Sequence, residues 1–217
     1  IKKSFSKAED GKSYILTAVK EVLIDRPGAA VSLKYDISYE VFANGTIEVH
    51  STFKKPENEP LIRRLGLQLE LDPEFNKIEW YGRGPIENYT DRKTAAFVGR
   101  YQKTVSEMAS EEYINSQSQG NRENIRWVEM SSGSGKAFKI SSLNVLSFSA
   151  IPFTDQELWE TDHDFELREK KITKTYLNLD RIQQGLGNAS CGPLPLDKYM
   201  IPENQELNFA FRIEPVE

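Results

Sequence analysis

Apolar and polar residues alternate along most of the chain, and this period of two limits the possible folds more than any other feature of the sequence. The alternation runs through residues 31–41 and 47–53, and it returns at 65–71 and 207–213. Asn44-Gly45 separates the first two runs, and both residue types tolerate the positive φ angles of a tight hairpin turn. Strands with one apolar face predict two packed antiparallel sheets.

Shorter strands are expected in six further segments, whereas helix is expected in only two. Residues 91–98 are expected to form one or two helical turns capped by Thr90 or Asp91, and residues 158–167 could form another. The further strands are expected at 13–25, 76–81, 125–131, 137–142, 145–150 and 176–184. We therefore expect residues 1–217 to form a single all-β domain with less than about a tenth helix, well below the usual third.

Charge and cysteine content exclude several classes of partner. The chain has 33 acidic and 28 basic residues and a net charge of −5. Nucleic acids and anionic membranes are bound by a surplus of cations, so we expect neither as a partner. Cys191 is the single cysteine, which rules out an internal disulfide and is compatible with the cytoplasm or periplasm of a bacterium.

The sequence contains no pattern that predicts a catalytic or cofactor site. Glycoside hydrolysis normally needs two facing carboxylates, and there is no βαβ alternation to build the barrel on which such pairs usually lie. The two histidines are His50 and His163. The tripeptide Asp162-His163-Asp164 is a poor metal site, because adjacent residues rarely converge on one ion. We therefore expect no catalytic residue, no metal and no cofactor in this chain.

Three segments carry more polar and aromatic residues than a plain β-sandwich requires. The first, residues 80–92, is interpreted either as a sugar subsite or as a buried network in which each Arg pairs with an acid. The chemistry favours the network, so a mostly structural role is expected for Arg83, Glu87, Asn88, Asp91 and Arg92. The other segments are 117–122 and 185–193, and the small residues of the last suit a loop that another surface approaches closely.

These three segments, in this order, resemble the C-terminal domain of the β-galactosidases of glycoside hydrolase family two. Residues 80–92 (WYGRGPIENYTDR) are similar to that family's signature W-Y/F-G-R-G-P-x-E-N-Y-x-D-R. Gly120-Asn121-Arg122 followed by Ile125-Arg126-Trp127 resembles a second block of the family. A third block of the family is similar to residues 146–150, His163 and the stretch from 177–180 to Gly192-Pro193. The resemblance therefore covers roughly Ile62 to the C-terminus.

The resemblance implies an antiparallel β-supersandwich of the galactose-mutarotase-like type, which serves as an accessory domain of a retaining β-galactosidase. In that family the domain packs against a separate TIM barrel that carries the acid/base and nucleophile Glu residues. This chain alone is therefore expected to be inactive. The family domain begins upstream of Ile1, so its first strands are expected to be missing. The implied partners are the barrel, a galactoside at the domain edge and, in a homo-oligomer, further copies of the parent.

The resemblance also implies that the loop at 185–193 contributes to the substrate site, exposed at one end of the sandwich. Asn188 and Ser190 are expected to hydrogen-bond to sugar hydroxyls, and Cys191 to make a small, weakly polar contact. Many family members have Ser-Trp-Gly-Pro here, and Cys191 takes the position of the Trp in the galactose platform. A thiol cannot cover a sugar face as an indole does. In a second departure, Ser116-Gln117-Ser118 replaces the family's Pro-Gln-Glu.

Two functions of other classes compete with the accessory role. A stand-alone carbohydrate-binding module would present an exposed aromatic platform, and the sequence offers no obvious trio of surface Trp residues. A mutarotase-like epimerase would need a His/Glu acid–base set in a concave cleft, for which His50 and His163 are poorly placed.

Overall fold

The computed structural model describes residues 2–26, 29–55, 62–109, 113–187 and 192–216. Of these residues, 53% lie in strands and 9% in helices, as the alternation predicted. The elements are β1 (Lys2–Lys7), β2 (Ser13–Arg26), β3 (Ala29–Phe42), β4 (Ile47–Lys54), β5 (Arg64–Leu71), β6 (Phe75–Gly84), β7 (Phe97–Thr104), α1 (Val105–Met108), β8 (Trp127–Ser132), β9 (Ala137–Ser142), β10 (Ser147–Ile151), α2 (Asp155–Glu160), α3 (Asp164–Arg168), β11 (Thr175–Gln183), a 3₁₀ turn (Asp197–Tyr199) and β12 (Glu206–Val216).

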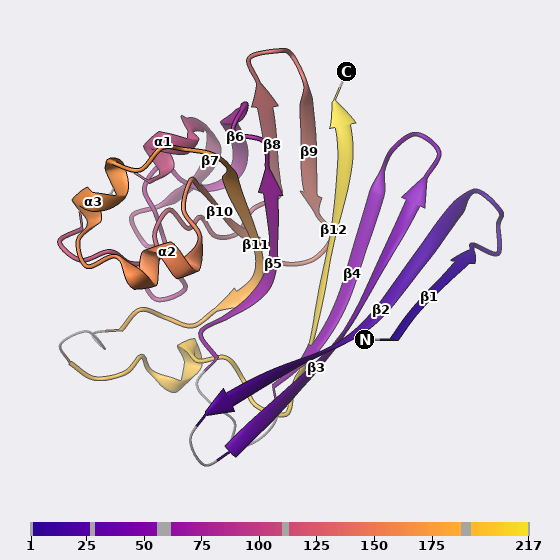
Figure 1. Ribbon diagram of the computed structural model, residues 1–217, viewed down its shortest axis with the longest axis horizontal. Coiled ribbons are helices and arrows are strands. Elements are labelled where there is room, and N and C mark those ends of the chain that lie inside the picture. Colours follow the sequence, from indigo (N-terminus) through magenta and orange to yellow (C-terminus); the bar gives the residue numbers. More distant parts are fainter. Residues whose placement is uncertain (1, 27–28, 56–61, 110–112, 188–191, 217) are drawn as a thin grey trace.

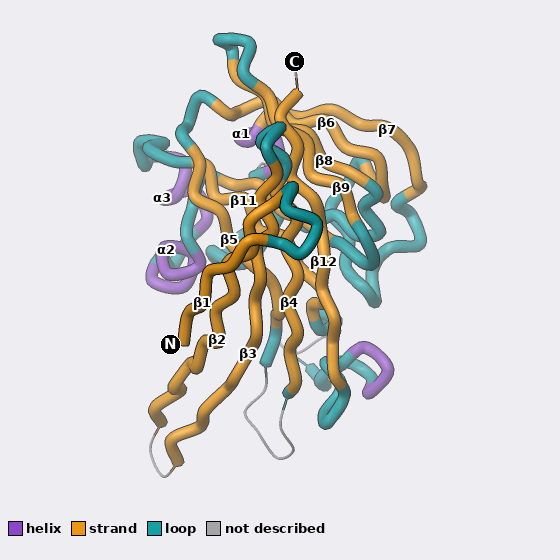
Figure 2. The backbone as a smooth tube through the Cα atoms, turned by 90° about the vertical axis from the view of Figure 1, so that its right-hand side faces the viewer, coloured by secondary structure: helices purple, strands orange, loops and turns teal. Residues whose placement is uncertain are grey.

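The strands form two antiparallel sheets, which confirms the predicted all-β supersandwich. The large sheet has nine strands in the order β1-β2-β3-β4-β12-β9-β8-β6-β7, and the small sheet has the order β10-β11-β5. The three α-helices lie at the same end of the molecule as the small sheet, away from β1–β4 (Figure 1). Figure 2 shows the neighbouring strands β1–β4 and β12 running side by side through the large sheet.

The turn between β3 and β4 forms as the Asn-Gly pair predicts. Gly45 has a φ of +84°, a conformation that side chains with a Cβ rarely adopt. The amide of Phe42 donates to the carbonyl of Thr46 at 2.9 Å and closes the hairpin. Because Val41 then pairs with Ile47, the apolar positions of both strands face the same side of the sheet.

One face of the large sheet is apolar from β2 to β6. The register places one row of side chains on this face, from β2 to β6: Tyr14, Val41, Ile47, Ile213, Ile140, Val128 and Trp80. The small sheet covers the β12–β6 part of the face with buried side chains that include Phe148, Leu177 and Leu179. These residues form the main hydrophobic core.

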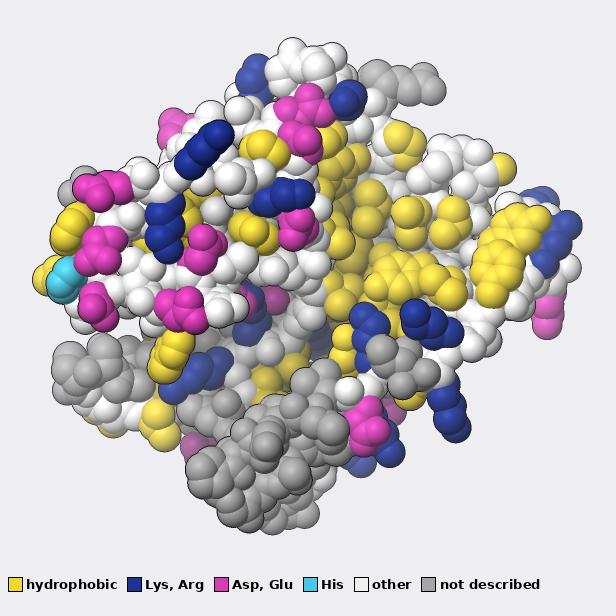
Figure 3. Space-filling model, in the orientation of Figure 1, with side chains coloured by type: hydrophobic (Ala, Val, Ile, Leu, Met, Phe, Trp, Pro, Cys, Tyr) yellow, Lys and Arg dark blue, Asp and Glu magenta, His cyan; other side chains and the backbone are white. Residues whose placement is uncertain are grey.

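The same face is exposed where it continues over β1–β4. Phe5 is 68% exposed and stacks on Tyr14 with ring centroids 5.5 Å apart, and Leu16 and Val41 are also exposed. Figure 3 shows apolar side chains gathered on this part of the surface. Contiguous apolar surface of this kind marks a contact site for another protein segment or a ligand.

The structure corrects the sequence-based elements in three places. Residues 91–98 are not helical: Tyr89 and Arg92 form an isolated bridge, and β7 begins at Phe97. Residues 158–167 belong to two short helices, α2 and α3, rather than to one. The strands β1 and β7 and the helix α1 were not predicted. None of the helices in the described residues is long and apolar enough to cross a bilayer.

Candidate functional site

The signature segment, residues 80–92, begins within β6 and continues into a loop that contacts several other segments. Glu87 is the centre of this loop and is only 6% exposed. Its carboxylate accepts hydrogen bonds from the guanidinium of Arg92 and the hydroxyl of Tyr113. It also accepts from the backbone amide of Gly120 at 2.9 Å. One buried carboxylate therefore joins three stretches of chain, as the expected polar network requires.

Burial raises the pKa of Tyr113, the tyrosine whose hydroxyl donates to Glu87. The pKa of Tyr113 is raised to about 12, first by burial and then by its hydrogen bond to the Glu87 carboxylate. The pKa of neighbouring Tyr89 is also raised, mainly by burial. The guanidinium carbon of Arg92 lies over the Tyr89 ring, 5.3 Å from the centre of that ring. Both phenols therefore keep their protons at neutral pH, and Tyr113 acts as a hydrogen-bond donor.

Asn88 docks the second family block against the signature loop. Its backbone amide donates to the carbonyl of Asn121 at 2.9 Å, and Asn121 Nδ2 donates back to the carbonyl of Asn88 at 2.7 Å. Asn88 Oδ1 accepts from the amide of Glu123 at 2.9 Å. Gln183 Nε2 then donates to Asn121 Oδ1 at 2.9 Å and brings the end of β11 into the same network. The signature loop, the second family block and the end of β11 are thus joined by hydrogen bonds.

Arg122 completes the contact between these two blocks. It is fully buried, and its Nη2 donates to the carbonyl of Pro85 at 2.8 Å. Its guanidinium also lies 5.6 Å from the centre of the Trp80 ring, which suits a cation–π contact. The Trp80 indole in turn donates to the carbonyl of Arg83 at 3.0 Å. The indole of the signature and the guanidinium of the second block therefore contact each other inside the domain.

Asp91 connects the signature loop to the first residues of the expected substrate loop. Its two carboxylate oxygens accept from the amides of Leu186 and Gly187 at 3.0 and 2.8 Å. Gly185 allows this approach, because a Cβ there would lie 2.7 Å from Asp91 Oδ2. The Gly185 amide donates to the carbonyl of Tyr199 at 2.7 Å, which holds the segment from its other side.

The expected substrate-binding residues Asn188, Ser190 and Cys191 lie outside the described residues. The residues on either side of them, 186–187 and 192–193, are exposed. Asp91 therefore holds the two residues, Leu186 and Gly187, that directly precede them.

Arg83 differs from the expected pairing of each Arg with an acid. Its Nη1 donates to the backbone carbonyls of Lys93 at 3.2 Å and Ala96 at 2.7 Å. These bonds hold residues 93–96, the returning arm of the loop, against the guanidinium. The sequence contains no sign of this contact, because the two partners are carbonyl groups that every residue carries.

We predict that Arg83→Ala destabilises the domain by about 2–3 kcal/mol, because two charge-assisted hydrogen bonds are lost and two carbonyls lose a donor. Urea unfolding of the purified variant measures this change. Arg100→Ala is the matched control, since Arg100 is an exposed partner of Glu79 and surface pairs contribute about 0–1 kcal/mol. Equal stability of the two variants would contradict a structural role for Arg83.

No group of three or more His, Cys, Asp or Glu side chains suited to a metal ion occurs among the described residues. His163 begins α3 without a side-chain cap and stacks on Phe165, with ring centroids 5.6 Å apart.

Sequence reasoning assigned no role to Tyr113, Asn121 or Gln183, although all three bind the signature network.

Comparisons with known proteins place the chain in a family. The profile of the β-galactosidase small chain matches residues 2–213. Similar curated proteins include the β-galactosidases of Halalkalibacterium halodurans (30% identity, 83% of this chain, 18% of that protein) and Staphylococcus xylosus (30%, 82% and 17%). The β-galactosidase of Streptococcus thermophilus aligns at 24% identity over 98% of this chain and 21% of its own length. The chain thus spans about a fifth of the length of these relatives.

Solved structures similar to this chain include aldose epimerases. The GalM/aldose epimerase homologue from C. elegans has a TM-score of 0.45 and 13% identity, covering 100% of this chain and 69% of that chain. A putative aldose 1-epimerase from Escherichia coli K12 has a TM-score of 0.41 and 8% identity, covering 99% and 68%. From the match over residues 2–213, this chain belongs to the β-galactosidase small-chain family.

Proposed function

We propose that residues 1–217 act as a single accessory domain of a retaining β-galactosidase, an enzyme that hydrolyses terminal β-D-galactosides. The family match over nearly the whole chain is the observation that carries this proposal. The catalytic Glu pair is supplied by a separate TIM barrel, and this domain adds the loop at 185–193 to the edge of the active site.

The anchoring of the loop supports its part in the proposal. A loop that contacts a substrate must be held in place, since an error of about 1 Å in position can cost a factor of about 100 in rate. The bonds from Leu186 and Gly187 to Asp91 provide such an anchor, and Asp91 is itself in the signature segment. The network thus acts on the substrate indirectly, by positioning the residues that follow Gly187.

The exposed apolar face over β1–β4 supports association with other parts of a larger protein. Phe5, Tyr14, Leu16 and Val41 continue the row of side chains that is buried at the other end of the sheet. The relatives are about five times longer than this chain and provide the chain length for such a contact.

The loop's role is tested by kinetics of the whole β-galactosidase that contains this chain. Asn188→Ala is expected to lower kcat/KM for lactose by about 3- to 10-fold, the equivalent of one lost hydrogen bond. Cys191→Trp is expected to change kcat/KM by more than about twofold, because an indole offers the sugar a stacking face.

Asn76→Ala is the matched control, since Asn76 is an exposed residue of β6 far along the chain from the loop. It is expected to leave kcat/KM unchanged. If neither loop variant moves kcat/KM by more than about twofold, less than about 0.5 kcal/mol of transition-state binding, the loop is not part of the site.

A further inference from the structure

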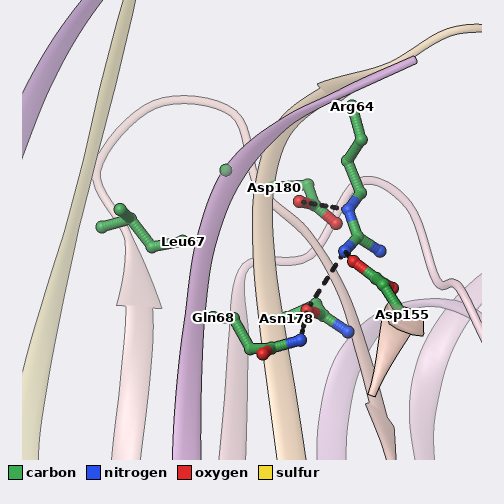
Figure 4. A pocket seen from close by; sticks show the side chains of 7 residues that line it. Arg64, Leu67, Gln68, Asp155, Asn178 and Asp180 are labelled. Atoms are coloured by element: carbon green, nitrogen blue, oxygen red, sulfur yellow. Dashed lines mark hydrogen bonds and ion pairs between the residues drawn. The ribbon is translucent and has the colours of Figure 1, made fainter. Parts of the chain in front are cut away.

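A polar pocket of about 350 Å³ lies on the small sheet, beside α2. Side chains alternate along β11, so Asn178 and Asp180 face away from the core side that carries Leu177 and Leu179. Figure 4 shows the polar side chains around this pocket directed towards one another. They come from β5, β11 and the first turn of α2: Arg64, Gln68, Asp155, Asn178 and Asp180.

Hydrogen bonds between the lining residues hold the pocket in shape. Gln68 Nε2 donates to Asn178 Oδ1 at 2.9 Å, and Asn178 Nδ2 donates to Ser149 Oγ at 3.1 Å. Arg64 Nη2 binds the carboxylate of Asp155 and lies 3.4 Å from Asn178 Oδ1. The donors and acceptors are therefore pre-organised on two paired strands, which lowers the entropy cost of binding a ligand.

Asp180 is buried in the pocket, with 2% of its surface exposed, the same fraction as Asn178. Its Oδ2 accepts from Gln183 Nε2 at 2.9 Å. Its Oδ1 lies 3.6 Å from Arg64 Nε, which is longer than a hydrogen bond. An oxygen atom about 2.8 Å from both atoms can bridge them, accepting from Arg64 and donating to Asp180. The pocket thus has a place for a hydroxyl group.

The titration of Asp180 suits it to both roles of a hydroxyl partner. Burial raises the pKa of its carboxyl group to about 7, although the charge of Arg64 and the bond from Gln183 act in the opposite direction. Near neutral pH the group therefore exists in both forms, and it can donate or accept a hydrogen bond.

Charge and composition identify the class of ligand. Arg64 is balanced by Asp155 and Asp180, so the pocket offers no net positive charge to an anion. The carboxamide, carboxyl and guanidinium groups of the lining can hydrogen-bond to adjacent hydroxyl groups of one ligand. The volume of the pocket lies within the usual range for small-molecule sites, about 300–1,000 Å³.

An exposed aromatic ring lies on the same helix as Asp155. Trp159 follows Asp155 by four residues on α2, so both side chains lie on one side of that helix. The Trp159 side chain is 90% exposed. An exposed indole beside a polar pocket offers a flat apolar surface to the C–H face of a sugar ring.

We propose that this pocket binds a neutral monosaccharide unit through Arg64, Gln68, Asn178 and Asp180, with Trp159 beside it. The proposal goes beyond the accessory role, because every lining residue belongs to this chain and no barrel is required. It adds a carbohydrate-binding site to the domain.

The test is equilibrium binding of D-galactose and D-glucose to the purified 217-residue chain, followed by NMR. The side-chain amide signals of Gln68 and Asn178 are expected to shift, with a dissociation constant in the millimolar range that few polar contacts give. Galacturonate is expected to bind more weakly than galactose, because its carboxylate meets Asp155 and Asp180.

Gln68→Ala and Trp159→Ala are expected to weaken binding by about fivefold or more. Gln156→Ala is the matched control, since Gln156 is an exposed residue of α2 that does not line the pocket, and it is expected to bind as the unchanged chain does. Circular dichroism and melting temperature establish that each variant is folded.

Three outcomes would overturn the proposal. If no neutral hexose shifts these signals at about 100 mM, the pocket holds only water or a side chain from elsewhere in the protein. If binding survives Gln68→Ala unchanged, the sugar binds at another place. If galacturonate binds as well as galactose, the site is not selective for neutral ligands. None of these results depends on the kinetics of the loop, so the two proposals can fail separately.

Discussion

The purified 217-residue chain is expected to show no turnover of nitrophenyl galactosides, at least about a million-fold below the whole β-galactosidase. Retaining glycosidases need two carboxyl groups about 5–5.5 Å apart with the scissile bond between them. Asp155 and Asp180 share the polar pocket, but the guanidinium of Arg64 contacts both and occupies the place between them (Figure 4). Glu87 is buried and bound by three donors.

The assay uses chain produced in a host that lacks its own β-galactosidase. Turnover that purifies with the chain and is lost in Asp155→Asn would contradict the prediction, because it would place a catalytic carboxylate in this domain. Turnover that purifies with the chain but is unaffected by Asp155→Asn would contradict the prediction as well, because it would place the catalytic carboxylates elsewhere in this domain.

Glu87→Ala is expected to destabilise the domain by about 3–5 kcal/mol, the largest stability effect of any signature residue. The substitution removes the acceptor of Arg92, Tyr113 and the Gly120 amide at one step. It leaves the Arg92 guanidinium without its carboxylate partner and the buried Gly120 amide without an acceptor, and both losses lower the stability of the domain. For a domain of this size, the melting temperature is expected to fall by roughly 10 °C.

Glu9→Ala provides the matched control, because Glu9 is exposed in the turn between β1 and β2. Its substitution is expected to change stability by less than about 0.5 kcal/mol. Glu87→Gln keeps an acceptor but removes the charge, so it is expected to fall between the two. A Glu87→Ala domain that melts with the unchanged chain would rule out Glu87 as the centre of the network.

The alternation of apolar residues was sufficient to predict most strands, because it is a local property of the sequence. It could not predict that β12 lies between β4 and β9, since strand order depends on pairing between distant segments. β7 was missed because it is an edge strand, and its Phe97 and Val98 are exposed rather than alternating with a buried face.

The polar network was predicted in outline but not in its contacts. The residues of the signature stand out in the sequence by their density of charge and aromatic rings. Their partners do not, because Asp91 binds backbone amides 95 and 96 residues away and Glu87 binds a tyrosine 26 residues away. The assignment of Asn188, Ser190 and Cys191 to substrate binding came from the family resemblance, not from the chemistry of the residues.

The most direct test of the account is a structure of the proposed parent β-galactosidase with a galactoside bound. We expect the loop at 185–193 to lie against the active site of the barrel, with Asn188 or Ser190 within hydrogen-bond distance of a sugar hydroxyl and Cys191 in contact with the sugar. We also expect Asp91 to keep its bonds to Leu186 and Gly187 in that complex. A loop that faces solvent and makes no contact with the sugar or the barrel would contradict the proposed role of this domain.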